Sequence, residues 1–146
     1  QVPNPNNVNS ACEYYCQVGT SDDDNLRCRL ALFAHIVDQP IFSRLRTQEQ
    51  LGYSVWSGPR ISAGNMGFHV LLQGEKSATF VETRIEACFE DLCRILNDMP
   101  DGEFEANLRG LIGKRQQKPK NLEEETLQYW RHMRDGDYDF ERRELH

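Results

Sequence analysis

The chain has 146 residues, of which 38% are hydrophobic and 27% are charged. That length suits one domain with a real core, and that composition argues against wholesale disorder. The net charge of −6 argues against a nucleic-acid partner, because such binding depends on neutralising phosphates. No apolar run approaches the roughly 20 residues that cross a bilayer, so no membrane partner is expected.

The cysteines indicate a reducing compartment. There are five of them, an odd number without paired spacing, which is poor support for a disulfide framework. On a strand, Cys12 and Cys16 would lie about 13 Å apart, too far to bond to each other. We therefore expect buried, inert thiols and a cytoplasmic location, with an organelle matrix as the alternative. The chain has neither an initiator methionine nor a signal peptide, so we expect a piece of a longer protein.

The first part of the chain predicts one strand and two helices. Residues 8–18 alternate between apolar and polar side chains, which predicts a half-buried strand. Apolar side chains at helical spacing predict a helix over residues 26–37, ended by Pro40. Residues 41–46 predict a second, short helix that carries Arg46 in its last turn.

The middle of the chain predicts a hairpin followed by a helix. Residues 53–57 and 66–73 read as antiparallel strands, with turn residues at Gly58-Pro59 and at 63–65 between them. Apolar side chains at helical spacing then predict a helix over residues 81–96.

Two more helices are expected near the C-terminus. The first has a predicted buried stripe, and Asn121 is expected to cap the second. The stripe consists of Phe104, Leu108, Leu111 and Ile112. Strands and helices succeed each other without βαβ alternation, which predicts an α+β fold in which an antiparallel sheet packs against helices as a two-layer sandwich. We expect residues 8–146 to form a single domain after a linker-like segment at residues 1–7.

The segment that joins the short helix to the hairpin carries the most chemistry. It reads Leu45-Arg46-Thr47-Gln48-Glu49-Gln50-Leu51-Gly52-Tyr53 and turns through a single glycine. A guanidinium and a phenol at the junction of two rigid elements can aim two donors at a peptide carbonyl. The structural alternatives stay open: Arg46 can be a cation at a helix C-terminus, and Tyr53 can be a core aromatic.

No metal site is expected in this chain. A catalytic zinc site on a helix needs two imidazoles one turn apart to hold the metal and a carboxylate to take the proton of the bound water. The nearest pattern, His35-Ile36-Val37-Asp38-Gln39, lacks the second histidine and the glutamate. His35 therefore reads as an ordinary helix residue, and the chain reads as one half of an active site.

These residues resemble the C-terminal, non-zinc-binding half of the insulysin group of the pitrilysin-like zinc metallopeptidases. The resemblance covers most of residues 8–140. Its parts are residues 45–53, Ser57-Gly58-Pro59-Arg60, Gln73-Gly74-Glu75-Lys76, residues 114–120 and Tyr129-Trp130. It implies an α+β sandwich domain cut at both ends, with residues 141–146 as a truncated helix. It also implies zinc in the parent enzyme, held by the N-terminal half of the same chain, which would be a partner of this part.

The resemblance implies a fragment of a zinc metalloendopeptidase that degrades or processes peptides. Arg46 and Tyr53 would contact the substrate carbonyl and the oxyanion that develops from it. Gln50 and Gly52 would lie at the substrate-binding edge and set the angle between those two side chains. The fragment would supply these contacts and chamber wall, but no zinc site, so alone it would bind no zinc and be inactive.

Two further alternatives remain open. The basic residues Lys114, Lys118 and Lys120 read either as a solvated helix end, which is the favoured interpretation, or as a site for polyanions such as polyphosphate. The whole chain could instead be a non-catalytic structural or peptide-binding domain of a degenerate pitrilysin-like protein. An unrelated α+β interaction module would require the motif to match by chance.

Overall fold

The computed structural model describes residues 6–135 and residue 140. The chain falls into two compact units, residues 1–103 and residues 104–146, and each is described by itself. The predicted linker at residues 1–7 lies mostly outside the described residues, and the predicted truncated helix at 141–146 lies entirely outside them. One domain over residues 8–146 stays a prediction.

The elements confirm an α+β fold with an antiparallel sheet. Their bounds are β1 Ser10–Thr20, α1 Asp24–Ile41, η1 Phe42–Gln48, β2 Ser54–Ser62, β3 Asn65–Gly74, α2 Ala78–Asn97, α3 Asp101–Arg115 and α4 Leu122–Asp135. The η1 segment is a π-helix, a wider turn than the short α-helix predicted for residues 41–46.

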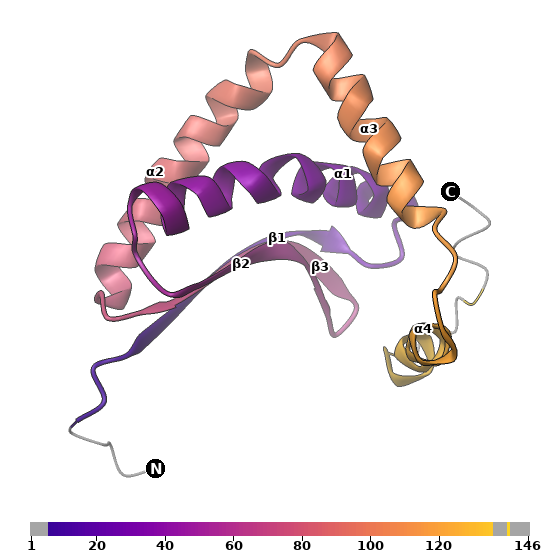
Figure 1. The fold of residues 1–146 in the computed structure, drawn as a ribbon, viewed down its shortest axis with the longest axis horizontal. Helices are drawn as coiled ribbons and strands as arrows, with labels where there is room; N and C mark the ends of the chain where they lie inside the picture. The colour runs from indigo at the N-terminus through magenta and orange to yellow at the C-terminus, as the bar shows by residue number, and fades with distance from the viewer. Residues whose placement is uncertain (1–5, 136–139, 141–146) are drawn as a thin grey trace. The chain divides into compact units, whose positions relative to one another are not determined.

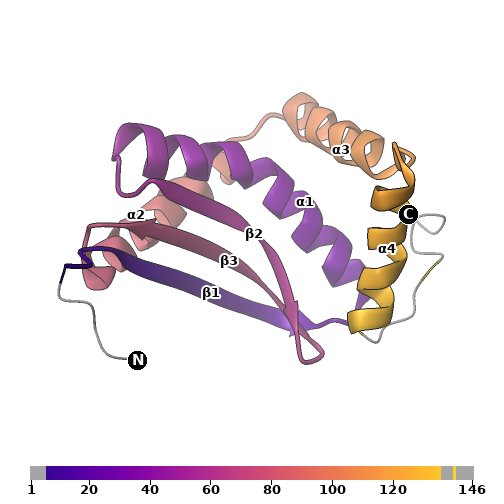
Figure 2. The same cartoon turned by 60° about the horizontal axis from the view of Figure 1, so that its bottom comes forward.

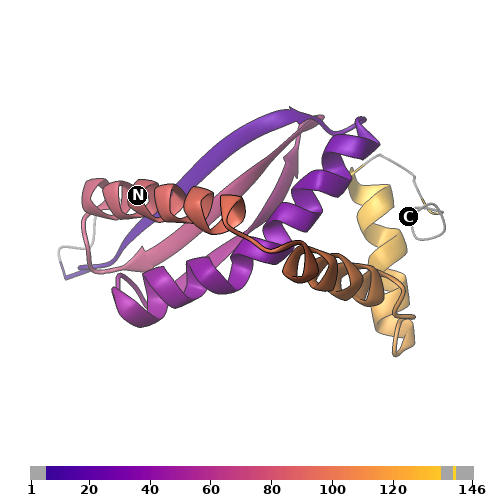
Figure 3. The same ribbon diagram turned by 90° about the horizontal axis from the view of Figure 1, so that it is seen from above.

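The sheet has the order β1-β3-β2, so the last strand in sequence lies in the middle (Figure 2). In β3, alternate side chains from Met66 to Leu72 are buried. α1 packs against β2 and β3, and α2 packs against β1. Both helices lie over the same face of the sheet (Figures 1 and 3). Within the first unit this makes two layers, one of helices and one of strands.

The predicted end of the first helix at Pro40 is wrong. α1 runs through Pro40 to Ile41 and continues without a break into η1. A proline removes one N–H and crowds the preceding turn, and a wider turn follows it here. Val37, Ile41 and Leu45 are each at most 1% exposed, so the buried stripe continues across the proline and holds both segments on the core.

The predicted turn at Gly58-Pro59 is also wrong. β2 continues through both residues to Ser62, and the chain reverses at Ala63 and Gly64, whose φ angles are 50° and 75°. Positive φ at both central residues is typical of a tight hairpin turn. Because β2 is an edge strand, Pro59 can lack an N–H there without breaking a ladder between two strands.

The core of the first unit lies between α1, α2 and the sheet. α2 is capped by Ser77, whose side chain accepts from the Phe80 N–H, and it buries Val81, Ile85, Cys88 and Leu92. Burying side chains of this kind contributes about 1.5–3 kcal/mol each for the larger ones. This core fixes η1 and the start of β2, which carry the predicted site.

The second unit contains most of α3 and all of α4. The predicted cap is confirmed, because the Glu124 N–H donates to Asn121 Oδ1 at 2.9 Å. The predicted buried stripe on α3 is wrong: Phe104, Leu108 and Ile112 are 45%, 37% and 41% exposed. Helical spacing identifies an apolar face, but it does not supply a surface to cover it, and the described residues leave this face open.

Candidate functional site

The predicted pair Arg46 and Tyr53 flanks a short connection between η1 and β2. Arg46 lies in the last turn of η1, directly after the fully buried Leu45. Tyr53 lies one residue before β2 and is 53% exposed, so the alternative that it fills the core is wrong. Among the described residues, no hydrogen bond or ion pair of the Arg46 guanidinium or the Tyr53 hydroxyl is present. Both donors are therefore available to another molecule.

The connection is tied to its neighbours through the backbone. The Leu51 N–H donates to Leu45 O at 3.0 Å, and the Tyr53 N–H donates to Gln73 O at 3.0 Å. Leu51 is buried between these two bonds. Gln50, a predicted substrate-binding residue, is exposed and has φ 49°, in the left-handed region that costs a residue with a Cβ about 1–2 kcal/mol.

Gly52 is required by close packing against β3. A Cβ on Gly52 would lie 2.3 Å from Gln73 O and 2.8 Å from Leu72 Cδ2. A Cβ on Gly74 would lie 2.7 Å from the Cα of Gly52. The two glycines thus let the connection contact the end of the central strand β3. This contact fixes the position of the Tyr53 backbone relative to β3. The sequence marked Gly52, but nothing in it indicated that Gly74 is its partner.

Glu49 is the residue that sequence reasoning missed. Its carboxylate accepts from Arg84 Nε at 2.6 Å and Arg84 Nη2 at 2.9 Å, and from Arg44 Nε at 2.5 Å. Arg44 also pairs with Asp91, which pairs in turn with Arg94. This network ties the end of η1 to α2. A glutamate between two candidate site residues was the available signal, but Arg84 lies 35 residues away in sequence.

The two arginines explain the acidity of this carboxyl group. Hydrogen bonds from Arg84 and then from Arg44 lower the pKa of Glu49 from 4.5 to about 2, against the opposing effect of partial burial. The Glu49 side chain is only 17% exposed, so these charged hydrogen bonds are poorly screened by solvent. Glu49 is therefore a firmly ionised anchor and not a group that exchanges protons near neutral pH.

The sheet face away from the helices carries a second set of polar contacts. Glu13 on β1 pairs with Arg60 on β2 and accepts a hydrogen bond from His69 Nδ1 on β3 at 2.9 Å. The bond from Arg60, and then that from His69, lowers the pKa of Glu13. Trp56 is 67% exposed on β2, and its Nε1 donates to Ser54 Oγ at 2.8 Å. Arg60 therefore ties β2 to β1 across this face.

The basic residues lie in the other unit. Lys114 is exposed in the last turn of α3, and Lys118 and Lys120 are exposed in the connection to α4. Arg46 and Tyr53 belong to residues 1–103, the first compact unit. Anion binding by Lys114, Lys118 and Lys120 stays a prediction.

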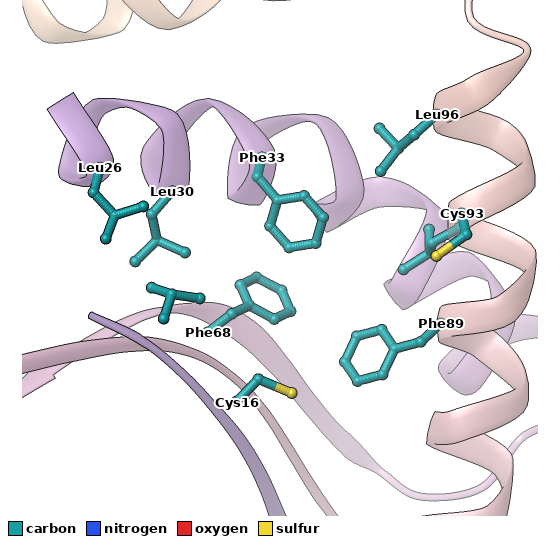
Figure 4. A pocket seen from close by; sticks show the side chains of 10 residues that line it. Cys16, Leu26, Leu30, Phe33, Phe68, Phe89, Cys93 and Leu96 are labelled. Carbon is teal, nitrogen blue, oxygen red and sulfur yellow. The ribbon is translucent and has the colours of Figure 1, made fainter.

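An apolar cavity of about 350 Å³ opens between the helices and the sheet. Phe33 of α1, Phe68 of β3 and Phe89 of α2 point into it, with the thiols of Cys16 and Cys93 on its walls (Figure 4). Its lining includes no charged side chain and none of residues 46–53. It has no group that could polarise a peptide carbonyl, so it is separate from the predicted site.

The described residues contain no cluster of three His, Cys, Asp or Glu side chains that could hold a metal ion. Across the same part of the chain, no helix combines the length and hydrophobicity of a membrane span. The five cysteines are free thiols, but the prediction that they are buried holds only for Cys88 and is wrong for Cys93, which is exposed on α2.

The sequence of this chain is similar to those of known peptidases. Residues 32–130 match the family model of the PQQ synthase PqqF-like C-terminal lobe domain 4. Insulin-degrading enzyme of Homo sapiens is 36% identical over 140 residues, which is 94% of this chain and 14% of that protein. The A-factor-processing enzyme of Saccharomyces cerevisiae is 36% identical over 138 residues, which is 94% of this chain and 13% of that protein.

A solved structure agrees with these sequence matches. The crystal structure of pitrilysin superposes with a TM-score of 0.77 and 28% identity, over 95% of this chain and 15% of that chain. The chain thus spans only a small share of each protein that it resembles.

Proposed function

Because the chain belongs to the insulysin and pitrilysin family of zinc metallopeptidases, as a part of their C-terminal half, we propose that Arg46 and Tyr53 complete the active site of a metalloendopeptidase. The full-length protein would degrade or process peptides. This part would supply contacts to the substrate and a wall of the chamber that encloses it. The observation that carries the proposal is the exposed Tyr53, joined to Arg46 by a short connection whose backbone is fixed at both ends.

The chemistry depends on where charge develops. When a peptide carbonyl is attacked, negative charge grows on its oxygen. A phenol and a guanidinium already aimed at that oxygen stabilise the charge without reorganising, and losing one such donor typically costs about 2.7–4 kcal/mol. Arg46 has a planar fork of donors suited to an oxygen acceptor. Gln50 and Gly52 would form the edge against which the peptide lies.

The zinc of such an enzyme does not fit the residues described here, which offer no ligand set. It would be held by the N-terminal half of the same protein, where a bound zinc ion supplies Lewis-acid chemistry. The partners of this part would therefore be that half and the peptide substrate. A cytoplasmic or organelle-matrix location agrees with five free thiols and remains part of the proposal.

The rival function is that of a non-catalytic domain that binds peptides or holds partners. The presence of both Arg46 and Tyr53, one on each side of the connection, favours the enzyme. In the full-length protein, Tyr53→Phe removes one hydroxyl from an exposed ring, so fold and zinc content should not change. We expect kcat to fall by about 10²- to 10³-fold, as for the loss of one preorganised donor, with a smaller change in KM.

Arg46→Lys is the companion test. The lysine ammonium keeps the charge of Arg46 but not its planar fork of donors, so kcat should be lower in this variant too. If Arg46 also holds the substrate carbonyl before reaction, KM should rise as well. If a folded, zinc-loaded Tyr53→Phe variant kept full kcat, the catalytic proposal would be wrong, and the non-catalytic binding function would be favoured.

A further inference from the structure

We infer that Glu49 is a positioning residue, which acts through Tyr53 by clamping the connection between η1 and β2 to α2. The inference rests on the proposed function of Tyr53. It assigns a role to a side chain that would touch neither the substrate nor the zinc ion. The bidentate pair with Arg84 is the contact that makes the clamp.

The clamp has a well-defined geometry. Both carboxylate oxygens of Glu49 are used, since Arg84 takes one through Nε and the other through Nη2. Arg44 adds a third hydrogen bond to Oε1, from within η1 itself. A bidentate arginine fixes the orientation as well as the position of a carboxylate. The first residue of the connection is therefore held against a rigid helix.

The clamp is one of two fixed points. Only Gln50, Leu51 and Gly52 separate Glu49 from Tyr53. At the far end, Gly52 lies against the backbone of β3 and the Tyr53 N–H bonds to Gln73 O. A three-residue span held at both ends, with Leu51 buried in its middle, leaves the tyrosine little freedom.

Backbone strain supports the same reading. Gln50 directly follows Glu49 and has a positive φ although it carries a Cβ. Such a conformation persists only where the surroundings determine it, and it is often found where a side chain must be aimed. Releasing Glu49 would let Gln50 relax, and the phenol would then turn away from the place where the oxyanion forms.

The network could instead serve stability alone, so the test must separate the two roles. The chain offers a matched control in Glu13, which also accepts from an arginine and has a lowered pKa, but on the opposite face of the sheet. Glu49→Gln and Glu13→Gln make the same chemical change. In the full-length zinc-loaded protein, kcat, KM, zinc content and thermal unfolding are measured for both, each alone and combined with Tyr53→Phe.

If Glu49 acts through Tyr53, Glu49→Gln lowers kcat by about tenfold to a hundredfold, the range for a misplaced group or a lost supporting partner. KM and zinc content stay near those of the parent, and Glu13→Gln keeps full kcat. In the Tyr53→Phe background, Glu49→Gln causes little further loss, because the hydroxyl that it positions is already gone. If Glu49 had only a structural role, the fold-decrease in kcat of the double variant would be the product of those of the two single variants.

Arg84→Lys provides a second test of the clamp in case Glu49→Gln folds poorly. Arg84 is one-third exposed, and lysine keeps its charge while it loses the bidentate fork. It should lower kcat less than Glu49→Gln does, with the same absence of further loss beside Tyr53→Phe. Losses that multiply, or full kcat in Glu49→Gln when Tyr53→Phe is impaired, overturn the inference alone. Full kcat in Tyr53→Phe itself overturns the proposed function and this inference with it.

Discussion

Gly52 and Gly74 lie so close that a Cβ on Gly74 would come within 2.7 Å of the Gly52 Cα. The contact joins the connection before β2 to the end of β3, on which the position of Tyr53 depends. It leaves no room for a methyl group on either residue. The consequences of filling it can be measured.

Gly52→Ala should destabilise the protein and displace Tyr53. The new Cβ would meet Gln73 O at 2.3 Å, a backbone atom that cannot move without breaking the Tyr53–Gln73 bond. Overpacking of this kind costs about 1–3 kcal/mol. Chemical denaturation measures the loss. Gly58→Ala is the control, since a Cβ there meets nothing within 4 Å. Equal stability of the two variants would contradict the close contact.

Glu49 should make stability depend on pH in the acidic range. Its pKa is about 2 in the folded chain against 4.5 for a free side chain, so folding favours the ionised form. The stabilisation is fully present above about pH 4.5 and is lost as pH falls towards about 2, and at about 1.36 kcal/mol per unit it is on the order of 3 kcal/mol. Chemical denaturation should show that the unmutated chain has a larger free energy of unfolding than Glu49→Gln at pH 6, and that this difference is smaller at pH 3. A difference in free energy of unfolding that does not change with pH would refute the assigned pKa.

Lys114, Lys118 and Lys120 allow a direct test of polyanion binding. If the three exposed ammonium groups form a site, polyphosphate should bind with an affinity that falls steeply with added salt. Replacing all three by glutamine should abolish binding. Calorimetry at low and high salt makes the comparison. No binding at low ionic strength leaves the helix-end interpretation.

The 146-residue chain expressed alone should bind no zinc stoichiometrically and cleave no peptide. Zinc sites use His, Cys, Asp or Glu ligands that converge, and none converge among the described residues. Elemental analysis and a peptide-cleavage assay check both parts. One tightly bound zinc ion per chain would show that the ligand assignment is wrong.

Local patterns predicted the elements well where each residue's neighbours decide the structure. The alternation from Met66 to Leu72 placed β3, and helical spacing placed α2. The motif at residues 45–53 identified the family, which the matches to insulin-degrading enzyme and pitrilysin confirm. Roles for Arg46 and Tyr53 came from that resemblance and stay predictions.

The predictions were wrong where contacts between residues distant in sequence determine the structure. Pro40 and Pro59 looked like breaks, but a buried stripe carries the first helix onward and an edge position tolerates the second proline. Glu49 looked like any surface glutamate because Arg84, its main partner, lies 35 residues away. The stripe on α3 looked buried because spacing does not say what covers a helix.

The wide turn of η1 has a consequence for the chain's tolerance of insertions and deletions. Its backbone bonds reach five residues back, as from the Glu49 N–H to Arg44 O, where an α-helix reaches four. Removing one residue between Ile41 and Leu51 would let the segment rewind as an α-helix, so the side chains inside it would turn relative to the core. Arg46 and Glu49 would then face different neighbours, so the number of residues in this segment should be fixed more strictly than their identity.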